Sequence, residues 1–145
     1  MENEKNRYRK NVFICSPCAP TSDDPKARKI EAEQNRNRAR AACRYAVMKG
    51  AIPYAPHLYF TQFLDDEIPG ESNLGKKVGQ GWLLNCDEVW VIGNRISKGM
   101  EAEIVLAEEH NIPVKYLIDS RGELERLIGL LFPPNEIAAK MRDWR

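Results

Sequence analysis

The sequence predicts an α/β fold, in which helices cover both faces of a parallel sheet of about four to five strands and so form three layers. Short apolar runs of strand type recur at residues 11–16, 86–93 and 112–119. Segments whose apolar residues have helical spacing lie between these runs. Strands that alternate with helices form parallel sheets with right-handed crossovers. A chain of 145 residues is long enough for one such domain.

The first half of the chain predicts two strands around a long helix. Residues 1–10 are polar and predict a flexible lead-in to a single domain that spans 11–145. "NVFICS" (11–16) predicts the first strand, and "SDDP" predicts a helix start with Pro25 near the first helical position. This helix extends to about Lys49 and ends at Gly50. "AIPYAPH" (51–57) predicts a second strand or extended segment that prolines interrupt.

The second half continues the alternation. Residues 58–72 are aromatic and then acidic without a clear period, which predicts a long ordered loop. A helix is expected over 72–85 in spite of three glycines, followed by a strongly buried strand at 86–93. A helix over 99–110 and a strand over 112–119 come next. Two closing helices are expected, over 121–132 and over 135–144.

Composition excludes several classes of protein. Charged residues make up 30% of the chain and the net charge is +1, which argues against a surface for a nucleic-acid polymer. The basic run over 26–44 is interpreted as a solvated helix face. No apolar run approaches the ~18 residues of a membrane span. A polar N-terminus and four cysteines predict a cytoplasmic protein with free thiols.

Two glutamates near the start of the helix at 99–110 point to a site. On a helical projection of about 100° per residue, Glu103 lies in the middle of the apolar arc, whereas Glu101 lies on the wet face. A carboxylate in the first turn is stabilised by the helix dipole, which fits Glu101. Partial burial of Glu103 is unfavourable without a partner, so Glu103 is either a capped glutamate or a functional one. Ligands of parallel sheets bind beyond the carboxyl ends of the strands, near residues 15, 56, 93 and 119.

The segment "SKGMEAEIVLA" (97–107) resembles the signature of the nucleoside 2-deoxyribosyltransferase superfamily and its nucleotide N-glycosidase relatives. The resemblance implies a flavodoxin-like or Rossmann-like sheet and a glutamate nucleophile at Glu103. "CDEVWVIG" (86–93) is similar to the family's motif of an aspartate and a buried strand, which implies that Asp87 is the second catalytic acid. "VFICSP" resembles the first strand and the loop on the phosphate side. The implied reaction is hydrolysis or base exchange at the N-glycosidic bond of a nucleoside or nucleotide.

Two features depart from the family pattern. The family often has a tyrosine in the first strand, where this chain has Phe13, and "PYAPHLYFTQF" has no close match in the transferases. Phe13 favours an alternative function, a non-catalytic nucleotide-binding sensor or scavenger that uses the same pocket. Relatives form oligomers in which a neighbour completes the pocket, so we expect a homo-oligomer.

Further residues are predicted to bind the substrate. Ser97 precedes a helix and can contact phosphate, with Gly99 and Met100 in the same turn, although a serine at this position can also act only as a helix cap. Ser16 follows the first strand and belongs to a second possible anion site. The aromatic run that contains His57 and Tyr59 can stack on a nucleobase or can anchor its own loop in the core.

The cysteines and histidines predict no cofactor and no metal. "CSPC" (15–18) has the spacing of a redox pair, but the following helix starts too late to activate it. The spacing to Cys43 and Cys86 does not match a compact zinc site, and two histidines are too few for a histidine-rich one. A redox protein is therefore the third alternative, behind the enzyme and the sensor.

Overall fold

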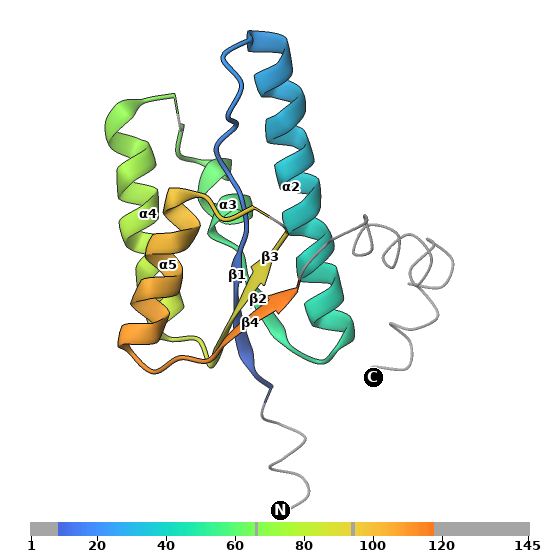
Figure 1. The fold of residues 1–145 in the computed structure, drawn as a ribbon, viewed down its shortest axis with the longest axis vertical. Coiled ribbons are helices and arrows are strands. Elements are labelled where there is room, and N and C mark those ends of the chain that lie inside the picture. The colour runs from blue at the N-terminus through green and yellow to red at the C-terminus, as the bar shows by residue number, and fades with distance from the viewer. Residues whose placement is uncertain (1–8, 66, 94, 118–145) are drawn as a thin grey trace, which may run out of the picture.

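A parallel sheet forms the middle layer of the protein (Figure 1). The computed structural model describes residues 9–65, 67–93 and 95–117. In this part of the chain the sheet has four strands in the order β2-β1-β3-β4. Their bounds are Asn11–Cys15 (β1), Ile52–Tyr54 (β2), Glu88–Ile92 (β3) and Val114–Leu117 (β4). All three pairings are parallel, with Val12 opposite Glu88 between β1 and β3.

Helices cover both faces of this sheet. The helices are α2 (Pro25–Met48), α3 (Pro56–Tyr59), α4 (Pro69–Leu84) and α5 (Lys98–Glu109), and the short 3-10 helix η1 is Phe60–Gln62. Figure 1 shows α2 on one face and the pair α4 and α5 on the other. The three-layer, Rossmann-like α/β fold that the sequence predicts is therefore confirmed.

Two hydrophobic clusters fill the space between the layers, because successive side chains of a strand point to opposite faces. Val12 and Ile14 of β1 pack with the alanines of α2 in the first cluster. Phe13 and Cys15 of the same strand pack with α4 and α5 in the second cluster. The central strands β1 and β3 are buried on both faces, which accounts for their continuous apolar runs.

The ends of α2 follow from local chemistry. The Asp24 carboxylate accepts a hydrogen bond from the Ala27 N–H at 3.0 Å, and Pro25 occupies the first helical position. At the other end Gly50 has a φ of +84°, a left-handed conformation that glycine adopts without steric cost. The sequence contains both the signal for the start of α2 and the glycine at its end, and the predicted helix is confirmed.

One predicted element is wrong. Residues 58–72 do not form one long loop, because α3 and η1 occupy 56–62 and α4 already begins at Pro69. Prolines at the first helical positions of α3 and α4 start these helices without side-chain caps. The predicted closing helices at 121–132 and 135–144, and residues 1–8 of the predicted lead-in, lie outside the described residues.

Within the described parts of the chain, no helix combines the length and the apolar character that crossing a membrane requires.

Candidate functional site

The carboxyl edge of the sheet gathers the chain segments that carry the predicted site. Parallel strands end at the same edge, so the loops after β1 and β3 and the start of α5 lie close together there (Figure 1). Cys15 is the last residue of β1, and Ser97 is the N-cap of α5. The site is therefore built on rigid elements that meet at one edge.

Glu103 projects from the core-facing side of α5. Its neighbours at helical spacing, Met100, Ile104 and Ala107, are buried. Glu103 itself is half-buried, whereas Glu101 is exposed. The helical projection thus identified correctly which of the two glutamates faces inward.

Burial controls the charge of Glu103. Desolvation raises the pKa of its carboxyl group from the ordinary 4.5 to about 8, and the positive charge of Lys76 on α4 opposes this rise. Among residues 9–65, 67–93 and 95–117, no hydrogen bond or salt bridge satisfies the Glu103 carboxylate. A half-buried carboxyl group whose pKa is raised by burial is a candidate functional group.

Cys15 is the β1 residue beside Glu103. Burial, with a smaller contribution from the negative charge of Glu103, raises the pKa of the Cys15 thiol. The thiol donates a weak hydrogen bond to the carbonyl oxygen of Met100 at 3.7 Å, one helical turn before Glu103. Phe13 lies two residues earlier on the same face, buried in the second hydrophobic cluster. Phe13 and Cys15 thus both lie on the face of β1 that packs against α5.

The first turn of α5 has a well-defined cap. The Ser97 hydroxyl accepts a hydrogen bond from the Met100 N–H at 3.2 Å, and the Met100 sulfur accepts one from the Ser97 N–H at 3.5 Å. The N–H groups of Lys98 and Gly99 belong to the first turn, where no intrahelical acceptor is available. A side chain at Gly99 would meet only the Ser97 hydroxyl, at 3.9 Å, so this backbone is open to a ligand. Ser97 is thus a helix cap whose turn also offers amide donors.

Ser16 extends the site from the end of β1. Its side chain is 1% exposed, and its hydroxyl has no hydrogen-bond partner within the described chain. A buried hydroxyl without a partner is energetically unfavourable, and the role of Ser16 in ligand binding stays a prediction.

Asp87 lies at the opposite edge of the sheet. Its carboxylate accepts a hydrogen bond from the Asn11 N–H at 2.8 Å, and its own N–H donates to the Asn11 carbonyl at 2.7 Å. Asn11 is at the amino end of β1 and Cys15 at the carboxyl end, which are about 13 Å apart at about 3.3 Å per residue. Asp87 therefore joins β3 to β1 at the end of β1 opposite Cys15, and its role as the second catalytic acid stays a prediction.

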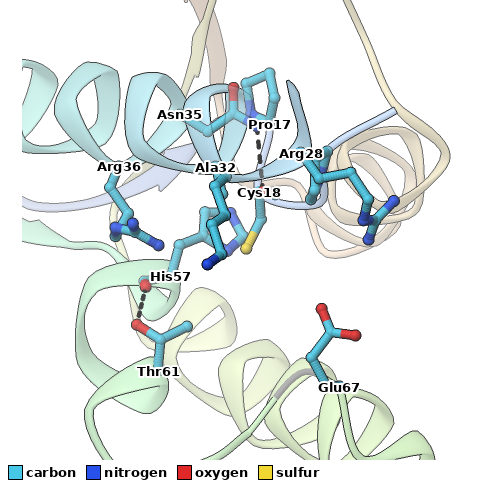
Figure 2. Close-up of a pocket in the computed structure, with 11 residues that line it drawn as sticks. Pro17, Cys18, Arg28, Ala32, Asn35, Arg36, His57, Thr61 and Glu67 are labelled. Carbon is cyan, nitrogen blue, oxygen red and sulfur yellow. Dashed lines mark hydrogen bonds between the residues drawn. The ribbon is translucent and has the colours of Figure 1, made fainter. Parts of the chain in front are cut away.

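A pocket lies on the α2 side of the same edge (Figure 2). Its volume is about 200 Å³. The loop after β1, the first half of α2, α3 with η1, and Glu67 form its walls. His57, which the sequence analysis predicts to bind the substrate, lines it. Glu103 is not part of its lining, so two separate features flank the loop after β1.

Tyr59 lies in an aromatic cluster. Its ring centroid is 5.1 Å from that of Trp82 on α4 and 5.2 Å from those of Phe60 and Phe63. Tyr59 nevertheless remains 52% exposed. The aromatic run thus divides, with His57 in the pocket wall and the other rings packed against α4.

All four cysteines are free thiols. In the described ranges no group of three or more potential ligands among His, Cys, Asp and Glu is arranged for a metal ion. Burial also raises the pKa of Cys43 to about 11, which keeps this thiol protonated.

Comparisons with known proteins concern the family and the fold of this chain. A family model described as a domain of unknown function (DUF7768) matches residues 10–117. The solved structure of a 2-deoxyribosyltransferase from Bacillus psychrosaccharolyticus is similar, with a TM-score of 0.57 and 12% sequence identity. The similarity covers 77% of this chain and 74% of that one, and at this identity it shows a shared fold. No curated protein matches the sequence.

Proposed function

The chain belongs to the family described as a domain of unknown function (DUF7768), and from this premise we propose that it cleaves or exchanges the N-glycosidic bond of a nucleoside or nucleotide. The similar structure is that of a 2-deoxyribosyltransferase, so the fold is compatible with this chemistry. The observation that carries the proposal is Glu103, a half-buried carboxyl group without a partner at the carboxyl edge of the sheet.

In the proposed reaction, a carboxylate oxygen of Glu103 attacks C1′ of the sugar. The C1′–N bond breaks, and the base leaves with the bonding electron pair and takes up a proton. Water or a second base then attacks C1′, loses a proton and releases the Glu103 carboxylate, which gives hydrolysis or base exchange. Retaining glycosidases use the same two steps at O-glycosides.

The attacking form of Glu103 is the ionised one. With a pKa of about 8, the group is largely protonated at neutral pH in the ligand-free protein. Positive charge nearby favours ionisation, and Lys76 supplies it. Oxocarbenium-like charge that develops on the sugar also favours the ionised carboxylate. The proposed transition state therefore stabilises the ionised form of Glu103, which burial disfavours.

The direct test is incubation with a panel of nucleosides and nucleotides, followed by chromatographic detection of the free base. Release of a base supports the enzyme. A second function, a nucleotide-binding sensor, is favoured by the protonated state of Glu103 at neutral pH. Tight binding of one panel member without base release would select the sensor.

Ser97 gives a prediction that separates its capping role from ligand binding. We expect Ser97→Ala to lower the free energy of unfolding by about 1 kcal/mol, because the cap to Met100 is lost. Ser97→Asp keeps the cap but places a negative charge where we propose that phosphate binds. The aspartate variant should therefore retain its stability in chemical denaturation and lose affinity for nucleotides, while its affinity for nucleosides changes little. Equal losses for both ligands would remove the phosphate assignment.

Tyr59 is proposed to stack on the nucleobase, because half of its ring surface is exposed beside the carboxyl edge. We expect Tyr59→Ala to weaken binding of a nucleobase-containing ligand by about 1–3 kcal/mol in calorimetric titration. Tyr59→Phe keeps the ring and is the matched control. A variant that loses stability but binds as the parent does would show that Tyr59 only anchors η1 against Trp82.

A further inference from the structure

The pocket on the α2 side has an unusual lining for a core-facing helix surface. In the second half of α2, the inward stripe consists of the buried residues Ala39, Ala42 and Ala46. The same stripe continues toward the start of the helix at helical spacing through Asn35, Ala32 and Arg28, which line the pocket. The stripe thus becomes polar where α2 extends beyond the sheet and faces the pocket. Ala32 has a small side chain, which leaves the pocket open.

Positive charge dominates this pocket. Arg28, Lys29 and Arg36 line it, and among the described residues Glu67 is the one carboxylate in its lining (Figure 2). The neighbouring acids of α2 are engaged elsewhere, since Glu31 accepts hydrogen bonds from Thr21 and Ser22. Glu33 pairs with Arg36 and therefore offsets part of its charge. The lining retains a net positive charge from Arg28 and Lys29.

The walls of the pocket are fixed by hydrogen bonds. Arg28 donates to the Ser22 carbonyl at 2.9 Å through one nitrogen, which orients the guanidinium and leaves its other N–H donors available. The buried Asn35 donates to the Cys18 carbonyl at 3.2 Å, which holds the loop after β1 against α2. A fixed guanidinium beside a lysine in a concave pocket is suited to a phosphoryl group.

We propose that this pocket binds the outer phosphate of a nucleotide whose sugar lies at Glu103, so that the substrate class is a nucleoside di- or triphosphate. The proposal rests on the function proposed above. The two features flank one loop, because Cys15 lies beside Glu103 and Cys18 lines the pocket. Cys15 and Cys18 are three residues apart, so the chain between them spans at most about 11 Å, a distance that an extended phosphate chain is able to bridge.

Inorganic pyrophosphate tests the pocket without any glycosidic chemistry. In calorimetric titration of the full chain, we expect Arg28→Gln and Lys29→Gln each to weaken pyrophosphate binding about tenfold, the effect of one charge-assisted hydrogen bond. Glu67→Gln should strengthen binding, because it removes the opposing carboxylate. Arg44→Gln is the matched control, since Arg44 is an exposed residue of α2 outside the pocket. No pyrophosphate binding by the parent, or equal losses for Arg44→Gln and Arg28→Gln, overturns the pocket assignment.

A series of ligands with one base and zero to three phosphates then tests the link to Glu103. We expect Arg28→Gln to weaken the di- and triphosphates about tenfold and to leave the nucleoside and the monophosphate unchanged. Base release that is as efficient for the nucleoside as for the triphosphate would reject this inference and leave the glycosidase proposal standing. Tight, Arg28-dependent binding of triphosphates without base release would support the pocket inference and reject the glycosidase proposal.

Discussion

Glu103→Gln is expected to lose turnover by about a thousandfold or more on any nucleoside or nucleotide that the parent cleaves, because the amide cannot attack C1′. The substitution keeps the size of the side chain and removes its charge. Ligand affinity should therefore survive, and rates of base release should be compared at saturating ligand. With a slowly reacting substrate, mass spectrometry should detect a sugar adduct on the peptide that contains Glu103 of the parent and no adduct on the variant.

Glu101→Gln is the matched control for this experiment. Glu101 is on the same helix, two residues away, but it is exposed to solvent. We expect it to keep parental turnover and to lose a fraction of a kcal/mol of helix-dipole stabilisation, about 0.3–1 kcal/mol. If both glutamine variants turn over substrate as the parent does, Glu103 is not the nucleophile.

The pH dependence of stability should also single out Glu103. Because its folded-state pKa is about 8 against an ordinary 4.5, the folded protein holds a proton that the unfolded chain releases between these values. The contribution of Glu103 to the free energy of unfolding therefore falls as pH rises from 4.5 to 8. Glu103→Gln removes this contribution, so the variant should be more stable than the parent at pH 9 by about 2 kcal/mol, a value reduced from the full shift because the group is only half-buried.

Chemical denaturation of the parent, Glu103→Gln and Glu101→Gln at pH 5 and pH 9 measures this effect. The difference between Glu103→Gln and the parent should grow with pH, and the difference for Glu101→Gln should not. Turnover by the parent should rise with pH up to about 8, because the carboxylate is the attacking form. A rate that falls over the same interval would instead identify Glu103 as a proton donor to the leaving base. Increased stability on loss of a functional charge is the usual trade-off at an active site.

The sequence predicted most of the elements that form the sheet. The continuous apolar runs of β1 and β3 are characteristic of strands buried on both faces, and Asp24, Pro25 and Gly50 mark the ends of α2. The prediction of a long loop over 58–72 was wrong, because the short helices in this segment depend on contacts with α4. The rings of Tyr59 and Phe60 pack against Trp82, which is 22 residues beyond Phe60, and Phe63 packs against both of these rings. No local periodicity contains that information.

The sequence by itself determined the fold class and showed that Glu103, and not Glu101, faces the core, because both follow from periodicities of two and 3.6 residues within single elements. Only the tertiary structure decided which residues meet. It placed Asp87 at the amino end of β1, hydrogen-bonded to Asn11, and placed the Cys15 thiol near the charge of Glu103. The sequence of α2 indicates that its basic residues form a solvated face. In the tertiary structure three of them, Arg28, Lys29 and Arg36, line a pocket together with His57. Contacts between distant segments depend on how strands align and how helices pack. A shift of one residue in the register of a strand moves each of its side chains to the other face of the sheet.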